Sequence, residues 1–301
     1  MRLIKPSYSI IEQPSGLEGI YKQIELAGRT CYKSEDKITE DSAKAFVDRM
    51  IKSGHGAMLE HGTVYLDIPW NVTSAAFSLQ LRLKVLNYEN NKYSKVVDVG
   101  DHSYITTNYR VLVENGWLDD LQYICEPTEH HIKRVSVRFI CDRGVSHEFV
   151  RHRVMSFAQE STRYCNYSKD KFNNEITFII PEWCPEIRED SNKGWDPCSM
   201  YDKFYLQHLQ TAEDTYFSLL KQWDERVPDK RYKSGFRNNP WTPQQARAVL
   251  PNALKTELVM TGFIDDWEHF FFLRDAAAAH PQARELAEPL HKEFIEREYI
   301  K

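Results

Sequence analysis

The chain has 301 residues, of which 42% are hydrophobic and 13% aromatic, so it can build a sizeable core. Its 39 Lys and Arg residues stand against 44 Asp and Glu residues, and the net charge of −5 gives no global reason to expect nucleic-acid binding. No stretch reaches the roughly 18 consecutive apolar residues of a membrane helix, and we expect no secretory signal and no membrane partner. The six cysteines lack C-x-x-C spacing, which favours a reducing, cytoplasmic location over a disulfide scaffold.

Hydrophobic periodicity predicts a mixture of helices and strands. In chain order, the first elements are helices at Leu17–Cys31 and Thr39–Lys52, then strands at Thr63–Ile68, Val135–Cys141, Arg163–Tyr167 and Ile176–Ile180. The later elements are helices at Tyr205–Trp223, Asp265–Ala277 and Ala283–Ile300. The capping-box pattern Thr242-Pro-Gln-Gln245 predicts one more helix start, with proline at the first helical position.

Two stretches look like insertions rather than parts of the core. The first runs roughly from Asn87 to His130, and the second, rich in proline, glycine and charge, from Cys184 to Ser199. Because no clear linker separates compositionally different halves, we expect one elaborated domain over residues 1–301.

The stretch RHRVMSFAQESTR, from Arg151 to Arg163, gathers three arginines, one histidine and three hydroxyl residues in thirteen positions. A solvated basic loop is the simplest interpretation. A nucleic-acid patch is a second, but Glu148 and Glu160 interrupt the positive charge. A discrete phosphate site is a third, because arginine forks match phosphate oxygens and hydroxyls complete the cradle. The order Ser161-Thr162-Arg163, just ahead of the predicted strand, suits such an anion nest.

Two neighbouring patterns bear on this choice. Arg247 lies in the first turn or two of the helix predicted after Thr242, where the helix dipole also favours an anion. His147 and His152 resemble the H-E-x-x-H zinc pattern but are five residues apart, which separates them by about 140° around a helix. We therefore expect no metal site.

Beyond these residues, the chain resembles the flavin-dependent thymidylate synthases, the ThyX family. The carrying motif is Arg151-His152-Arg153, followed after seven residues by Ser161. Other segments resemble the family at matching positions: GRTCYKS, GHGAMLEH, DRGVSHEFVRHR, QESTRYCNYS, QQARAVLP and the Phe-Leu-Arg that ends at Arg274.

The resemblance implies an α/β fold with a mixed sheet flanked by helices, assembled as a homotetramer with flavin where subunits meet. It implies the synthesis of dTMP from dUMP. Methylenetetrahydrofolate would supply the one-carbon unit, reduced FAD the hydride, and NADPH the electrons that re-reduce the flavin.

The resemblance also implies roles for individual residues. Those matching flavin contacts are His55, Ala57, Arg151, His152, Arg153, Gln159 and His269. Those matching nucleotide contacts are Glu148, Arg151, Gln159, Glu160, Ser161, Thr162, Arg163, Arg247 and Arg274. Ser161 is then a phosphate binder and not a nucleophile.

One segment departs from the family. Many members have Asn-x-Arg where this chain has Phe263-Ile264-Asp265, which puts the flavin contacts of that segment in doubt; ordinary helix-start residues are the alternative. The loss of polarity there leaves open a catalytically silent flavin- or nucleotide-binding protein of the same fold. A basic RNA-binding module is a third possibility, disfavoured by the net charge of −5.

Arg274 is the predicted catalytic residue. Trp267, Phe270 and Phe271 precede it at spacings that place all four residues on one helix face. The guanidinium therefore either contacts a buried anion or extends past the aromatic rings to solvent or to Asp275. The family match favours the first: Arg274 matches the arginine credited with ionising N3 of the uracil ring.

Overall fold

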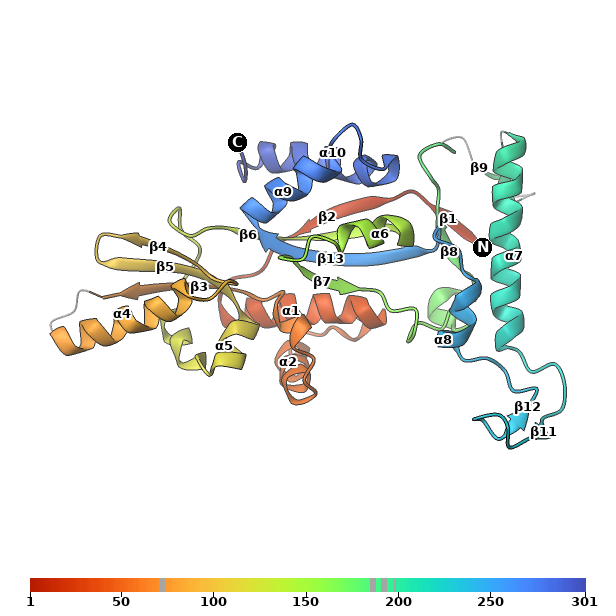
Figure 1. Cartoon of the computed structure of the whole chain (residues 1–301), viewed down its shortest axis with the longest axis horizontal. Helices are drawn as coiled ribbons and strands as arrows, with labels where there is room; N and C mark the ends of the chain where they lie inside the picture. Colours follow the sequence, from red (N-terminus) through yellow and green to blue (C-terminus); the bar gives the residue numbers. More distant parts are fainter. Residues whose placement is uncertain (71–73, 185–187, 191–193, 198) are drawn as a thin grey trace. The chain divides into compact units, whose positions relative to one another are not determined.

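The computed structural model describes residues 1–70, 74–184, 188–190, 194–197 and 199–301. The chain forms two compact units. Unit 1 comprises Met1–Ser7, Ile140–Glu148 and Glu160–Thr256, and unit 2 comprises Tyr8–Phe139, Phe149–Gln159 and Glu257–Lys301. Helices and strands are mixed throughout, which confirms the predicted α/β class (Figure 1). The expectation of a single domain stays a prediction.

A four-stranded sheet in the order β2-β6-β13-β7 lies largely in unit 2. Its strands are β2 (Ser7–Ile11), β6 (Arg134–Asp142), β13 (Lys255–Phe263) and β7 (Ser156–Gln159). Strand β6 carries the predicted buried face, since Val135, Val137, Phe139 and Cys141 are all buried. Helices α9 (Ile264–Arg274) and α10 (Pro281–Glu296) lie on one side of this sheet in Figure 1, and α1 (Gly16–Tyr32) on the other.

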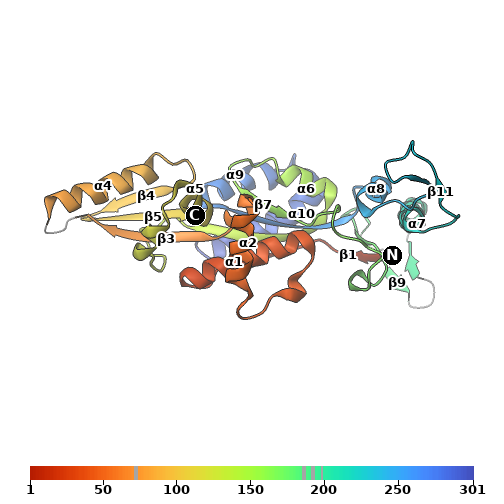
Figure 2. The ribbon, with the colours of Figure 1, turned by 90° about the horizontal axis from the view of Figure 1, so that it is seen from below.

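A second, three-stranded antiparallel sheet of unit 2 has the order β3-β5-β4. Strand β3 (Thr63–Pro69) pairs with β5 (His102–Asn108), which pairs with β4 (Lys95–Val99). Val64, Leu66 and Ile68 are fully buried, so the alternation predicted for this strand is confirmed. Helix α4 (Ala75–Glu89) lies along this sheet in Figures 1 and 2.

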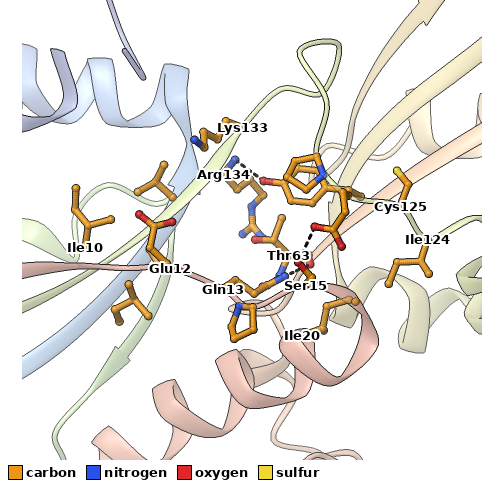
Figure 3. A pocket seen from close by; sticks show the side chains of 18 of the residues that line it. Ile10, Glu12, Gln13, Ser15, Ile20, Thr63, Ile124, Cys125, Lys133 and Arg134 are labelled. Atoms are coloured by element: carbon orange, nitrogen blue, oxygen red, sulfur yellow. Dashed lines mark hydrogen bonds between the residues drawn. The ribbon is translucent and has the colours of Figure 1, made fainter. Parts of the chain in front are cut away.

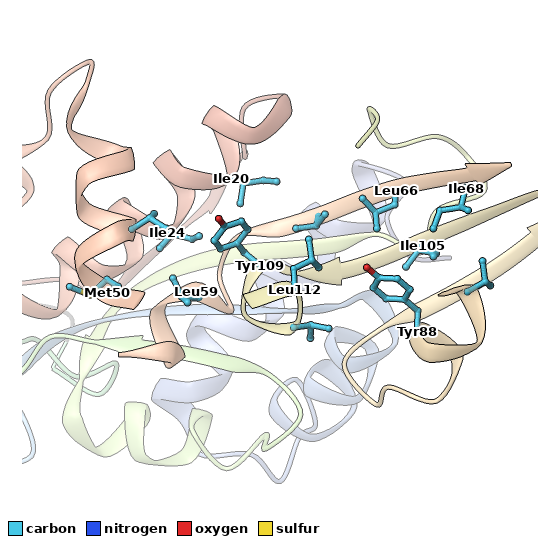
Figure 4. Close-up of a cluster of buried hydrophobic side chains, with 14 of the residues drawn as sticks. Ile20, Ile24, Met50, Leu59, Leu66, Ile68, Tyr88, Ile105, Tyr109 and Leu112 are labelled. Atoms are coloured by element: carbon cyan, nitrogen blue, oxygen red, sulfur yellow. The ribbon is translucent and has the colours of Figure 1, made fainter. Parts of the chain in front are cut away.

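The main core of unit 2 joins these elements (Figure 4). Ile20 and Ile24 come from α1, and Leu81, Val85 and Tyr88 from α4. The remaining short elements of this unit are α2 (Ser42–Lys52), α3 (Gly56–Leu59), α5 (Tyr109–Asn115) and the 3₁₀-helices Glu35–Lys37 and Leu118–Tyr123.

The expectation that Asn87–His130 lies outside the core is wrong. This segment forms β4, β5 and α5, and Ile105, Tyr109 and Leu112 are buried in the core of unit 2. Full burial of one such aliphatic side chain is worth about 1.5–3 kcal/mol, so the segment stabilises the unit. Whether it is an insertion relative to shorter family members stays a prediction.

Unit 1 has its own core around α7 (Met200–Leu220). Strand β1 (Arg2–Ile4) pairs in parallel with β8 (Thr177–Ile179). Leu209, Ala212 and Tyr216 of the predicted stripe are buried in α7, together with Leu206, which the periodicity did not predict. The helix ends before Trp223, which is 66% exposed, so the predicted end was too late.

The other elements of unit 1 are short. They are α6 (Arg143–Phe149, whose last residue belongs to unit 2), α8 (Pro243–Ala246), the 3₁₀-helices Asp170–Phe172 and Arg247–Val249, and the paired strands β9 (Arg188–Asp190) with β10 (Gly194–Asp196) and β11 (Val227–Pro228) with β12 (Phe236–Arg237). Within the predicted insertion Cys184–Ser199, residues 185–187, 191–193 and 198 lie outside the described residues.

The strand predicted at Arg163–Tyr167 is wrong. The backbone N–H groups of Tyr164 and Cys165 both donate to the carbonyl oxygen of Ser161, at 3.2 and 2.9 Å, which closes a turn. The strand of this region is instead Ser156–Gln159. None of the helices in the described ranges combines the length and hydropathy of a transmembrane span.

Candidate functional site

His152 is the central residue of the Arg-His-Arg motif, and unit 2 buries it. Its side chain is 6% exposed and packs against Phe270, with ring centroids 5.1 Å apart. Its Nε2 accepts a hydrogen bond of 3.1 Å from Nε of Arg274. The structure therefore brings together the motif histidine and the predicted catalytic arginine, which are 122 positions apart.

The environment of His152 disfavours its charged form. Burial, and then the positive charge of Arg274, lower the pKa of His152 to about 4. The imidazole is therefore neutral at pH 7, with its proton assigned to Nδ1 because Nε2 accepts. A neutral histidine adds no charge of its own, and the bond through Nε fixes the plane of the Arg274 guanidinium.

An aromatic wall supports Arg274, as its helical spacing predicted. Trp267, Phe270 and Phe271 of α9 are almost completely buried. The indole Nε1 of Trp267 donates to the carbonyl of Val135 at 3.1 Å, which ties the helix to β6. Arg274 at the end of this face is half-buried. Water is partly excluded there, so charges act on one another more strongly than in bulk solvent.

Five other predicted flavin-contact residues of unit 2 lie at its surface. Arg151 and Arg153 are exposed on either side of buried His152. His269 is exposed as well, with its ring 5.9 Å from that of His152. His55 and Ala57 are exposed at the start of α3. Exposed guanidinium and imidazole groups are donors suited to a phosphate-bearing cofactor, so this set fits the flavin dinucleotide that the sequence predicts.

In unit 1, the nucleotide-binding run forms a hydroxyl- and arginine-rich turn. The hydroxyl oxygen of Ser161 accepts from the backbone N–H of Arg163 at 3.3 Å. Nη1 of Arg247 donates to the hydroxyl of buried Thr162 at 2.9 Å. Two residues 85 positions apart, both predicted to contact the nucleotide, are thus joined.

The helix-dipole argument for Arg247 is wrong. Helix α8 has only four residues, and Arg247 caps its C-terminal end. The predicted capping interaction of Gln245 is present, since its Oε1 accepts from the backbone N–H of Thr242 at 2.8 Å. Proline 243 occupies the first turn as predicted. Arg247 must therefore act through its own charge, because a helix this short contributes little dipole.

Lys255 is the residue that sequence reasoning missed. Glu160 is buried, and its carboxylate pairs with Nζ of Lys255 at 2.9 Å. A lysine at the first position of a strand whose next eight residues are buried was the available signal. The pair holds the Glu160 carboxylate beside the turn that begins at Ser161.

Gln159 and Glu148 have half-buried side chains. Gln159 is the last residue of β7 and pairs with Leu258 of β13. Glu148 lies near the end of α6.

The N-terminal family motif GRTCYKS ends α1 and carries its own carboxylate partners. Arg29 pairs with Glu25 at 2.9 Å, and Lys33 with Glu257 at 2.7 Å. Buried Glu257 also receives a bond from Arg138. These cations contribute to the internal ion pairs of unit 2.

The segment GHGAMLEH also has structural bonds. Glu60 pairs with Arg110 at 2.6 Å. His61 is completely buried, and its Nδ1 shares a hydrogen bond of 2.8 Å with the hydroxyl of Thr261.

The segment Phe263-Ile264-Asp265 starts a helix, as its alternative interpretation stated. Phe263 precedes the first turn of α9, and its backbone N–H donates to Asp266 at 3.0 Å. Asp265 pairs with Lys95 at 2.9 Å. Among the described residues, no three His, Cys, Asp or Glu side chains lie close enough to hold a metal ion.

Comparisons with known proteins bear on this site. A family model described as thymidylate synthase complementing protein, Thy1, matches residues 126–297. A flavin-dependent thymidylate synthase of Pyrococcus furiosus is 30% identical over 161 residues, which are 54% of this chain and 54% of that protein. One of Corynebacterium aurimucosum is 24% identical over 266 residues, covering 88% of this chain and 71% of that protein. The match thus spans only about half the length of the Pyrococcus relative.

A crystal structure of the UMP/dUMP methylase PolB from Streptomyces cacaoi, bound with 5-Br dUMP, aligns with a TM-score of 0.41 and 15% identity. That alignment covers 98% of this chain and 93% of the other.

The segment that the family model matches is more than half of the chain. It contains the Arg-His-Arg motif, the Ser161 turn, and both Arg247 and Arg274. The resemblance drawn from these motifs is therefore confirmed, and the chain belongs to the Thy1 family of thymidylate synthase complementing proteins.

Proposed function

We propose that the protein makes dTMP from dUMP. The observation that carries this proposal is the family match over residues 126–297, which includes the joined pairs His152–Arg274 and Thr162–Arg247. Methylenetetrahydrofolate would be the one-carbon donor. Bound FAD would supply hydride chemistry after reduction by NADPH.

The residues of unit 1 are proposed to hold the dUMP phosphate. Ser161, Thr162, Arg163 and Arg247 offer hydroxyl and guanidinium donors, which match phosphate oxygens. The pair Glu160–Lys255 braces the turn from its buried side. Ser161 then acts as a binder, because no described contact places a general base on its hydroxyl to make it a nucleophile.

Arg274 is proposed to act on the uracil ring. C5 of uracil is a poor nucleophile while N3 carries its proton, and removing or sharing that proton moves negative charge into the ring. A guanidinium beside the ring oxygens stabilises this charge, and aromatic surroundings that partly exclude water strengthen the stabilisation. His152 would hold Arg274 in place without competing as a second cation.

Arg151, Arg153, His55, Ala57, Gln159 and His269 are proposed to contact FAD, with Glu148 near the nucleotide. In this proposal the flavin site draws residues from several chains of a homotetramer in the cytoplasm.

A catalytically silent flavin- or nucleotide-binding protein is the second candidate. Its support is the Phe263 segment, where a buried ring and a helix start replace the polar residues that many family members have. This candidate shares every binding proposal above and differs only in turnover.

Flavin binding tests the part common to both candidates. Titration of the purified protein with FAD, followed by visible absorbance and flavin fluorescence, should show saturable binding. Arg153→Gln should weaken it, because a charge-assisted bond to phosphate is lost. Arg231→Gln is the control, since it removes an exposed arginine paired with Asp229 and should leave FAD affinity unchanged. A protein that gives no spectral response to FAD would refute the synthase and would leave only a nucleotide-binding protein as the second candidate.

A further inference from the structure

Unit 2 contains a cavity of about 180 Å³ whose lining includes none of the predicted site residues (Figure 3). Its wall includes β2, the first residues of α1, the starts of β3 and β6, and the segment Ile124–Pro127. The cavity exceeds the roughly 150 Å³ of an engineered cavity that accepts benzene. It can therefore hold a small organic molecule.

Arg134 supplies a buried positive charge to this cavity. Its side chain is 9% exposed and lies among the labelled side chains of Figure 3. Nη1 donates to two neutral acceptors, the carbonyl of Glu60 at 3.2 Å and the hydroxyl of Thr63 at 3.3 Å. Within the described part of the chain, Nε has no hydrogen-bond partner.

Among the described residues, no carboxylate is hydrogen-bonded to Arg134, although the carboxylates of Glu60 and Asp266 favour its charged form from a distance. Glu60 lends its carbonyl to Arg134, but its carboxylate pairs with Arg110 at 2.6 Å. Burial lowers the pKa of Arg134 to about 10, which still leaves the guanidinium charged at pH 7. A buried charge without a directly bonded counterion is costly, so an anion that entered the cavity would relieve part of this cost.

Two further groups favour an anion. Lys133 also lines the cavity, and burial lowers its pKa; its Nζ lies 3.9 Å from the ring centroid of Tyr299. Helix α1, seventeen residues long, begins at the cavity wall with Gly16. Its cap residue Ser15 makes no capping bond, because its hydroxyl donates to Glu126 at 2.7 Å, so the helix start is left positive.

Two carboxylates limit which anion can bind. Glu12 lines the cavity and accepts from Arg297 at 2.9 Å and from Tyr299 at 3.2 Å. Glu126 lines it as well. A doubly charged phosphate would be repelled by both, whereas a single carboxylate directed at Arg134 is repelled less.

We propose that this cavity binds a small monocarboxylate, with its carboxylate on the guanidinium of Arg134 and its apolar part against Ile20 and Ile124. A ligand that binds the folded chain but not the unfolded chain raises the stability of the fold, so occupancy of the cavity can be measured as a shift in unfolding temperature. The site is independent of the proposed synthase activity.

Sodium acetate is the probe. The full chain should be unfolded thermally while acetate replaces chloride at constant ionic strength, and the unfolding temperature should rise saturably. Arg134→Met should weaken apparent acetate affinity by at least about tenfold. Arg231→Met, which removes an exposed arginine elsewhere, should leave the affinity unchanged.

Glu126→Gln keeps the test decisive if Arg134→Met fails to fold. Removing this like charge should raise acetate affinity several-fold, a gain that damage to the fold would not produce. The proposal is overturned if the parent shows no saturable acetate response, if neither variant alters it, or if phosphate stabilises the parent as much as acetate does.

Discussion

At the residue scale, the informative side chain is His152. In the sequence it stands between two arginines, where a charged surface histidine would be the ordinary expectation. The structure buries it against Phe270 and makes it an acceptor for Arg274. The motif therefore presents two exposed cations on either side of one buried, neutral histidine that positions Arg274.

The lowered pKa of His152 has a consequence for stability. The unfolded chain takes up this proton near pH 6.5, whereas the folded chain takes it up only near pH 4. The free energy of unfolding should therefore fall as pH drops through this window, and His152 contributes nothing to pH dependence above it.

His152→Gln retains an acceptor for Arg274 but cannot titrate. Denaturant titrations between pH 4 and pH 6.5 should show a shallower pH dependence for this variant than for the parent. Part of the slope should remain, because burial also lowers the pKa of His61, to about 3. Equal slopes in variant and parent would mean that His152 is not held neutral.

Arg274 and Arg247 are predicted to divide catalysis and binding. Arg274→Lys keeps the charge but loses the planar fork and its Nε bond to His152. Turnover should drop by roughly 10²-fold, while dUMP affinity in the presence of FAD falls less. Arg247→Lys loses the bond to Thr162 and should harm dUMP affinity first. Parent-like turnover of Arg274→Lys would refute the ionising role.

At the element scale, strong periodicity predicted the fold better than local chemistry did. The stripes of α1, α7 and α9 and the alternation of β3 and β6 were recognisable because each buries one face. The strand prediction for Arg163–Tyr167 was wrong because this segment begins with a turn closed by two hydrogen bonds to the Ser161 carbonyl, and such bonds leave no hydrophobic pattern in the sequence. The prediction that Arg247 lies in the first turns of a helix was wrong for a similar reason, since the length of a helix after a capping box is set by the packing of later residues.

Gly28 illustrates how a family motif can be structural. A Cβ at this position would lie 2.5 Å from Cζ of Phe46 on α2. The guanidinium carbons of Arg29 and Arg49 lie 5.0 and 5.1 Å from the centroid of the same ring. Alanine is the better helix former by roughly 1 kcal/mol, but the overlap should outweigh that gain.

Gly28→Ala should therefore lower the free energy of unfolding. The steric overlap should cost about 1–3 kcal/mol, and the gain in helix propensity should offset part of this cost. Phe46→Leu removes the ring and should make the same glycine substitution less harmful. A double-mutant cycle measured by urea unfolding checks this coupling. Additive effects of the two substitutions would show that the ring contact does not explain the glycine.

At the scale of the whole molecule, each unit carries part of the predicted site. Unit 1 contains the proposed phosphate-binding turn with Arg247, and unit 2 contains His152, His269 and Arg274. The sequence motifs named these residues but predicted neither the bond between His152 and Arg274 nor the bond between Thr162 and Arg247. The choice of Glu160 as the partner of Lys255, the core role of residues 87–130 and the Arg134 cavity were not predictable, because each depends on contacts between distant segments that no short motif encodes.

The direct test of the proposed function is product formation. Purified protein should be incubated with dUMP, methylenetetrahydrofolate, FAD and NADPH, and nucleotides should be separated and identified by mass spectrometry. dTMP should accumulate over many turnovers, and its formation should be lost when FAD is omitted from flavin-free protein. A protein that binds FAD and dUMP saturably but releases no dTMP would contradict the proposed function and would identify the silent binding protein instead.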